Sequence, residues 1–246
     1  MKSTLVNSLK QLPLALGQRE DRSFDNFIIA SDSEQGHSNR EIVTTLRQSQ
    51  LPFIYIWGER GCGKSHLLQA LSREANRQSQ SAIYLPLPEI IEMGASVLSG
   101  LDDMTLVVID DLDAINTIDD QREWEEALFG LYNQVRDMGS HIVVAANSPP
   151  DDLSLQLPDL ISRFHWGPIF QLQMLSDEEK LVALKQRAHE RGFELPDGTV
   201  NYLLRHGSRD LHHLFRILDE LDNASLVEQR KLTIPFVKAH INKASG

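Results

Sequence analysis

The chain has 246 residues, of which 41% are hydrophobic and 24% are charged, and this composition excludes a wholly disordered protein. Its 35 acidic and 24 basic residues leave a formal net charge of -11, which disfavours a broad surface for binding duplex DNA. A single cysteine, Cys62, excludes a disulfide framework, and no apolar run approaches the length of a membrane span. The first twenty residues lack the pattern of a signal peptide. We therefore expect a cytoplasmic protein with no membrane partner.

Residues 1–21 form a predicted flexible leader, because the globular pattern begins only near Phe24. Its stretch "QLPLAL" carries Gln11, Leu12, Leu14 and Leu16. Apolar residues exposed in a tail often bind a partner, and the alternative is a leader that packs on its own domain. Burial of a leucine contributes about 1.5–3 kcal/mol, whereas ordering a residue costs about 1–2 kcal/mol, so one tail should bind weakly.

Over residues 22–173, short β-branched or aromatic runs alternate with segments of helical period. The candidate strands are 53–57, 81–85, 105–110, 141–146 and 169–173. Residues 121–138 predict a helix whose apolar stripe consists of Trp124, Leu128, Leu131, Val135 and Met138. Strands that are apolar throughout and alternate with helices indicate a parallel sheet covered on both faces. We expect an α/β domain here.

Residues 174–246 contain no strand candidate and predict a small helical domain. The sequence "SDEE" at 176–179 is a capping box that should open a helix reaching Gly192. A second amphipathic helix is indicated by Leu211, Leu214, Phe215, Leu218 and Leu221, and a short third helix is expected near 235–243.

The sequence "GERGCGKS" fits the P-loop pattern and lies between a predicted strand and a predicted helix. Backbone N–H groups would surround the phosphates, Lys64 would reach the terminal phosphates, and the Ser65 hydroxyl would bind Mg²⁺. The alternative is a chance glycine-rich turn. The dinucleotide pattern is absent, which favours ADP or ATP over NAD. The predicted nucleotide-binding residues of this segment are Gly58, Gly61, Cys62, Gly63, Lys64, Ser65 and His66.

A second strand, "LVVIDD", ends in two carboxylates at the same edge of the predicted sheet. Asp110 could hold Mg²⁺ through water, beside the Ser65 hydroxyl, and Asp111 could orient an attacking water. The alternative is a pair of loop or cap aspartates. Because Asp111 is one methylene shorter than the glutamate common in fast ATPases, we expect the protein's own ATP turnover to be slow.

Three further polar residues are candidates for functional roles, but the sequence pattern around each of them is less specific. Asn147 ends the strand "IVVAAN" and could contact the terminal phosphate, or it could simply form the turn before "SPP". Arg163 and Arg216 lie in helical surroundings, where the local pattern alone favours surface ion pairs. The histidines show no spacing typical of zinc ligands.

Several of these motifs together resemble the AAA+ module of the bacterial replication initiator DnaA. They are "SFDNFI", "HSNREI", the P-loop with "GKSHLL", "IDD" and "SRFHWG", in that order over residues 22–230. The resemblance implies a five-stranded parallel sheet with a C-terminal helical lid and nucleotide between them. It also implies roles for Asn147 as sensor 1, for Arg163 as an arginine finger acting in trans, and for Arg216 as sensor 2.

The differences from DnaA are equally informative. DnaA continues past its lid into a helix-turn-helix domain, whereas this sequence ends at Gly246, so we expect DNA to be contacted only indirectly. The stretch at 11–16 resembles the motif by which partners engage the sliding clamp, the beta subunit of DNA polymerase III. A DnaA-like module with such a tail resembles the Hda family, the regulatory inactivators of DnaA.

That resemblance implies a negative regulator of replication initiation. With clamp loaded on DNA, the protein would present Arg163 to ATP held by DnaA, and its own site would act as a switch that favours ADP. An AAA+ interface also allows a homo-oligomer. One alternative is a helicase loader or DNA-remodelling ATPase whose turnover is stimulated by single-stranded DNA. Another is a clamp-binding scaffold whose P-loop is structural.

Overall fold

The structure, a computed structural model, describes residues 22–29, 34–48, 51–101, 103–206, 211–228 and 232–244. The leader motif at 11–16 lies outside the described residues. Five strands form one sheet: β1 (Phe53–Trp57), β2 (Ala82–Pro86), β3 (Leu106–Asp110), β4 (His141–Ala146) and β5 (Ile169–Gln171). All neighbouring pairs are parallel, and their order is β2-β3-β4-β1-β5. The predicted five-stranded parallel sheet is therefore confirmed.

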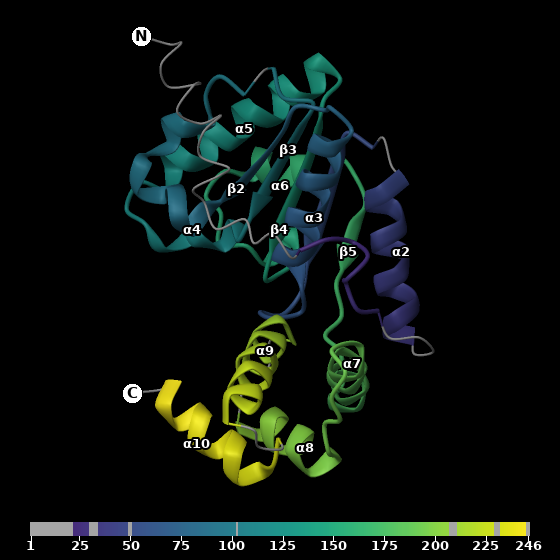
Figure 1. Ribbon diagram of the computed structural model, residues 1–246. Coiled ribbons are helices and arrows are strands. Elements are labelled where there is room, and N and C mark those ends of the chain that lie inside the picture. The colour runs from purple at the N-terminus through teal and green to yellow at the C-terminus, as the bar shows by residue number, and fades with distance from the viewer. Residues whose placement is uncertain are drawn as a thin grey trace.

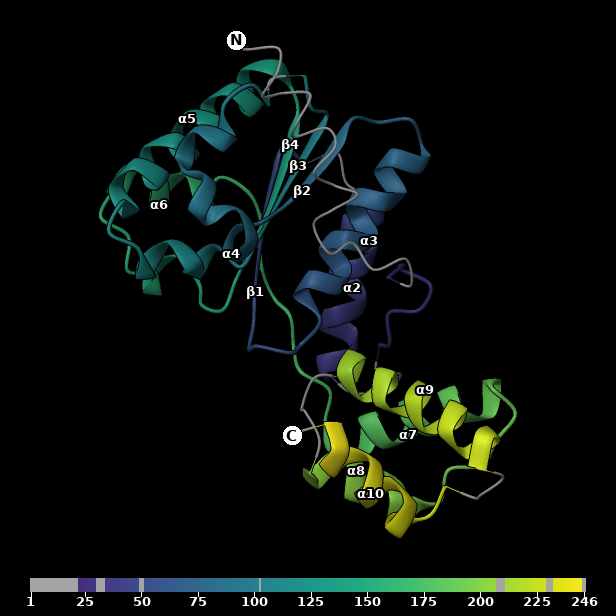
Figure 2. The same ribbon diagram turned by 60° about the vertical axis from the view of Figure 1, so that its left-hand side comes forward.

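Helices cover both faces of the sheet, as Figure 2 shows with the sheet nearly edge on. One face packs against α2 (Glu34–Gln48) and α3 (Lys64–Arg77). The other face packs against α4 (Leu87–Ile90), α5 (Gln121–Met138) and α6 (Pro158–Phe164), with short 3₁₀ turns at Ile91–Met93, Ala95–Leu98, Leu112–Thr117 and Pro150–Asp152. Because both faces are covered, strands β2 and β3 are buried at every position.

Helix α5 has the predicted limits, and four residues of its apolar stripe are buried: Trp124, Leu128, Leu131 and Val135. The fifth, Met138, belongs to the same apolar stripe but is 63% exposed. Met138 is the last residue of the helix, directly before Gly139, whose φ of +68° ends the helix with a left-handed cap. The apolar periodicity of the sequence thus continues by one residue beyond the part of the helix that is packed against the core.

The C-terminal helices pack on one another around a separate apolar core. They are α7 (Asp177–Glu190), α8 (Asp197–His206), α9 (Leu211–Glu228) and α10 (Ile234–Ala244), and Figure 1 shows them below the sheet domain. The capping box predicted at Ser176 is present, because its side chain accepts from the Glu179 N–H while Glu179 accepts from the Ser176 N–H. Helix α7 ends at Glu190, two residues before the predicted Gly192.

None of the helices within the described ranges is long and apolar enough to cross a membrane.

Candidate functional site

A cavity of about 970 Å³ lies between the sheet domain and the helical domain. It is lined by the β1–α3 turn, by the segment 22–29 and by residues of α7 and α9. Figure 1 shows that α9 faces the end of the sheet domain where α3 begins. Among the described residues, the cavity is lined by six cationic side chains, Arg22, Arg60, Lys64, Lys180, Arg187 and Arg216, and by three carboxylates, Asp25, Asp111 and Asp219. In a chain of net charge -11, this local excess of positive charge favours an anionic ligand.

The β1–α3 turn has the backbone that a phosphate site requires. Gly61 and Gly63 adopt φ values of +88° and +109°, which residues with a Cβ rarely reach. A Cβ on Gly63 would also lie 2.7 Å from the Phe27 ring. Gly63 directly precedes α3. The free N–H groups at the start of this helix therefore lie on the cavity side of the β1–α3 turn.

Lys64 is buried and bound to its own loop. Its Nζ atom donates to the backbone oxygen of Gly58 at 2.7 Å, to that of Glu59 at 3.2 Å and to Asn147 Oδ1 at 3.1 Å. The last contact joins the P-loop on β1 to the end of β4, two segments that are 83 residues apart. The structure therefore brings together Lys64 and Asn147, two residues that the sequence proposed separately.

Asp113 is a residue that sequence reasoning missed. Its Oδ2 atom accepts from the Asn147 N–H at 2.7 Å and from Asn147 Nδ2 at 3.0 Å. With its amide nitrogen held by Asp113, Asn147 presents its oxygen to Lys64. The signal was present in the sequence, since Asp113 follows "IDDL" at the same end of the sheet.

The two predicted acidic residues differ in their surroundings. Asp110 is 1% exposed, and its oxygens accept from the Tyr84 hydroxyl at 2.6 Å and from the Asp111 N–H at 3.0 Å. Burial, and then the Asp110 charge, raise the pKa of Tyr84, which keeps this hydroxyl a donor. Each Asp110 oxygen retains a lone pair that could accept from water around Mg²⁺. Ser65, the other predicted Mg²⁺ ligand, lines the cavity.

Asp111 lines the cavity in a left-handed backbone conformation with φ of 53°. Burial and then the charge of Asp110 raise its pKa, and Lys64 opposes this shift. Within the described part of the chain, no group of three or more His, Cys, Asp or Glu side chains is arranged to hold a metal ion. Any Mg²⁺ would therefore depend on nucleotide phosphates for several of its ligands.

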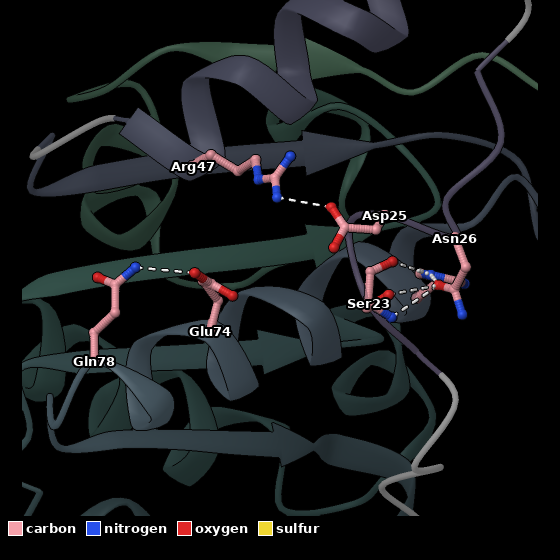
Figure 3. Close-up of polar contacts among 7 residues, drawn as sticks. Ser23, Asp25, Asn26, Arg47, Glu74 and Gln78 are labelled. Carbon is pink, nitrogen blue, oxygen red and sulfur yellow. Dashed lines mark hydrogen bonds and ion pairs between the residues drawn. The ribbon is translucent and has the colours of Figure 1, made fainter.

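The segment 22–29 packs over the start of α3, a relationship that sequence pattern did not reveal. His66 Nε2 lies 2.8 Å from the Ser23 oxygen and 3.0 Å from Asn26 Oδ1, and the Phe27 ring meets the His66 ring edge to face. Figure 3 shows the bonds between Ser23 and Asn26 and the ion pair of Asp25 with Arg47 of α2. His66 therefore fastens this segment beside the P-loop.

The helical domain contributes charged side chains that the sequence did not single out. Arg187 of α7 pairs with Asp219 of α9 at 3.7 Å, and both line the cavity. Arg216, the predicted sensor 2 residue, also lines it and contacts His213 at 3.0 Å and Glu220 at 3.8 Å. Lys180 is 4% exposed and lies in the same wall. Ligand binding here would engage both domains.

Arg163 lies elsewhere. It belongs to α6 and is not among the residues that line the cavity. Its guanidinium carbon lies 3.9 Å from the centre of the Trp166 ring and 4.9 Å from that of Phe129. Among the described residues, no carboxylate forms an ion pair with it, and its Nε atom is buried without a hydrogen-bond partner. Within the described residues, the Arg163 guanidinium is therefore contacted by aromatic rings and not by a carboxylate.

Helix α6 is itself fixed by a buried carboxylate on α5. Glu125 is 0% exposed and accepts from the N–H groups of Gln156 and Leu157, the latter at 2.6 Å, directly before the first turn of α6. Gln121, one turn earlier on α5, donates to Glu125 and to the Ser154 oxygen. A buried carboxylate needs such donors, and here they determine where α6 begins.

Comparison with known proteins agrees with this geometry. Residues 18–171 match the family described as the bacterial DnaA ATPase domain, and residues 177–241 match the one described as the lid domain of Hda. A relative from Haemophilus influenzae, described only as an uncharacterized protein, is 42% identical over 238 residues, which cover 95% of this chain and 99% of that protein.

Two solved structures show the same fold at lower identity. Domain III of the replication initiation protein DnaA from Thermotoga maritima aligns with a TM-score of 0.70 and 19% identity, covering 89% of this chain and 95% of the other. AMPPCP-bound DnaA from Aquifex aeolicus aligns with a TM-score of 0.64 and 21% identity, covering 84% of this chain and 66% of that one. At these identities, the alignments support the AAA+ fold alone.

Proposed function

Because this chain belongs to the DnaA-related AAA+ family and carries an Hda-type lid, we propose that it promotes hydrolysis of ATP bound to DnaA. Family membership supports regulation of replication initiation in general. The inactivation of DnaA, the participation of the sliding clamp and the adenine nucleotide in the protein's own site belong to the proposal.

The observation that carries the proposal is the position of Arg163. Among the described residues, six cationic side chains already line the protein's own cavity, and Arg163 lies apart from it with no described carboxylate as an ion-pair partner. In nucleotide hydrolases, an arginine supplied by a second protein accelerates phosphoryl transfer by about 10³ to 10⁵. Arg163 thus fits a donor to the ATP site of a partner rather than to its own site.

The protein's own site would bind ADP or ATP. Gly61, Gly63, Lys64 and Ser65 would hold the phosphates. Mg²⁺ would be held by Ser65 directly and by Asp110 through water, and the ion would neutralise phosphate charge. Arg187 and Arg216 of the lid would contact the same ligand, so the angle between the domains would depend on the nucleotide. In this proposal the site is a switch whose own turnover is slow.

The leader would attach the protein to clamp on DNA through Gln11, Leu12, Leu14 and Leu16. Tail binding should be weak, because leucine burial and chain ordering nearly cancel. Several equivalent pockets on a ring-shaped clamp, or a simultaneous contact with DnaA, would raise the effective affinity. The tail would then act as a tether that makes hydrolysis depend on DNA-loaded clamp.

The decisive experiment measures hydrolysis of ATP pre-bound to DnaA in the presence of clamp-loaded DNA. The intact protein should stimulate hydrolysis strongly, Arg163→Ala should abolish the stimulation, and Arg136→Ala should retain most of it. Arg136 is the matched control because it lies over the same Trp166 ring but is paired with Asp137 at 2.8 Å. Failure of the intact protein to stimulate would refute the proposal.

The tether is tested in the same assay by Gln11→Ala, with Gln18→Ala as a control in the same leader. Gln11→Ala should lose stimulation on clamp-loaded DNA, whereas Gln18→Ala should behave like the intact protein. If single-stranded DNA instead stimulates the protein's own ATP turnover and DnaA is unaffected, the loader or DNA-remodelling alternative replaces this proposal.

A further inference from the structure

An arginine finger works only if its guanidinium is held where a partner's phosphate can meet it. Arginine side chains have many rotamers, so an unsupported arginine must be ordered at each encounter, and this ordering lowers the rate of the reaction that it assists. In Arg163 this support does not come from a carboxylate, since no described residue forms an ion pair with it. The support comes from aromatic rings.

Trp166 is the ring closest to the Arg163 guanidinium, at 3.9 Å. A guanidinium stacked on an indole uses its flat face, whereas its N–H donors point outward along its edge. Stacking therefore leaves the donors free for phosphate oxygens, which an ion pair would not. Of the three guanidinium nitrogens of Arg163, Nε is buried without a hydrogen-bond partner in the described residues, whereas neither terminal nitrogen is in that condition.

The Trp166 ring is in turn held by the core of the sheet domain. Its ring meets the Phe53 ring of β1 edge to face at 5.5 Å, and Phe53 stacks on Tyr132 of α5 at 5.1 Å. The next residue, Gly167, passes so close to β1 that a Cβ there would lie 1.9 Å from the Phe53 oxygen. Trp166 is thus fixed to the sheet on one side while remaining 38% exposed.

The other end of α6 is fixed independently by Glu125, which accepts from the N–H groups of Gln156 and Leu157. Phe129, one turn after Glu125 on α5, supplies the second ring near Arg163, at 4.9 Å. Helix α5 therefore determines the start of α6, and the aromatic pair determines the direction of the arginine that α6 carries.

We propose that Trp166 is a positioning residue for Arg163, whose indole face supports the guanidinium so that its terminal nitrogens are presented to the phosphates of a nucleotide held by a partner. The identity of that partner rests on the proposed function. The contact between the Arg163 and Trp166 side chains does not rest on the proposed function, because both residues belong to this chain.

The first test compares Trp166→Leu with Trp166→Phe in the full chain, in the assay of DnaA-bound ATP with clamp-loaded DNA. Trp166→Leu should lower the hydrolysis rate at saturating protein by about threefold to thirtyfold, the range that a cation–π contact can supply. The half-saturating concentration should change little, because docking is unaffected, and Trp166→Phe should recover most of the rate. An unchanged saturating rate in Trp166→Leu would overturn the proposal.

The second test needs no activity. In an NMR spectrum of arginine side-chain Nε–H groups, the Arg163 signal, assigned by its loss in Arg163→Ala, should lie upfield of the Nε–H signal of an arginine in an unfolded peptide because of the ring currents. Trp166→Leu should move it toward the unfolded-peptide position. If the Arg163 signal of the intact protein is not displaced, the inference is overturned, even if the protein stimulates ATP hydrolysis by DnaA. If the signal is displaced, the inference is supported, even if hydrolysis by DnaA is not stimulated.

Thermal unfolding of each variant shows whether the fold is retained. If Trp166→Leu does not fold, Phe129→Leu removes the second ring instead and should lower the saturating rate by a smaller factor. A wild-type saturating rate in a folded Phe129→Leu variant would count against aromatic support of Arg163.

Discussion

Asp113 binds Asn147 through both its backbone N–H and its side-chain amide, at 2.7 and 3.0 Å, and the Asn147 oxygen in turn accepts from Lys64 at 3.1 Å. Three residues from the segments that follow β3, β4 and β1 thus form one chain of bonds beside the sheet. Asp113 determines which end of the Asn147 amide faces the P-loop.

Asp113→Ala should therefore weaken both folding and nucleotide binding. Two hydrogen bonds to a partly exposed carboxylate are lost, which should lower the free energy of unfolding by about 1–2 kcal/mol, measured by urea denaturation. The Kd for ADP should rise, because Asn147 is then free to turn. Exposed Asp119 serves as the control, and equal effects of Asp119→Ala would mean that only net charge matters.

Asp111→Asn should stabilise the protein at neutral pH. Burial and the Asp110 charge raise the folded-state pKa of Asp111, so the folded protein holds this proton more tightly than the unfolded chain. The free energy of unfolding then falls as pH rises through the raised pKa. Asparagine does not ionise, so the substitution removes this loss of stability. Asparagine also tolerates the left-handed backbone conformation of this position. Urea unfolding should show an advantage at pH 7 that shrinks as pH falls through the raised pKa.

A stability gain for Asp111→Asn that is equal at every pH would instead indicate a backbone effect. The same variant should also lose any ATP turnover of the protein's own site, because the amide cannot accept a proton from water.

Cys62 offers a direct probe of the P-loop, because it is the single cysteine of the chain. Burial raises the pKa of its thiol, although Lys64 partly opposes the shift. Alkylation by iodoacetamide at neutral pH should therefore be slower than that of a free thiol, and it should accelerate as pH rises. ADP or ATP at ten times its Kd should slow the reaction about tenfold. Equal labelling with and without nucleotide would refute nucleotide binding at this turn.

Gly167→Ala should be among the most destabilising small substitutions. The added Cβ would lie 1.9 Å from the Phe53 oxygen, so the backbone must move, at a cost of about 1–3 kcal/mol. Gly130→Ala on α5 is the matched control, since nothing lies within 4 Å of its Cβ position, and it should gain about 0.5–1 kcal/mol. Melting temperatures that move in the same direction for both variants would contradict this account.

The sequence predicted many of the elements of this fold, because these depend on local periodicity, whereas helices α2 and α8 were not predicted. Helix α5 has the predicted limits, and the strands β1 and β4 begin and end where their apolar runs do. The P-loop could likewise be recognised, since glycines, Lys64 and Ser65 lie within one short segment whose backbone geometry is local. Met138 marks the limit of such reasoning, because a periodic pattern does not reveal where the covering layer ends.

Only the tertiary structure decided which polar groups meet. The contact of His66 with Ser23, the bonds of Glu125 to the start of α6 and the pairing of Asp113 with Asn147 join segments between 31 and 43 residues apart. Such contacts depend on strand order and helix packing, which no local pattern encodes. The stack of Arg163 on Trp166 spans only three residues, yet it also depends on the fold, because Phe53 and Gly167 fix the ring that Arg163 covers.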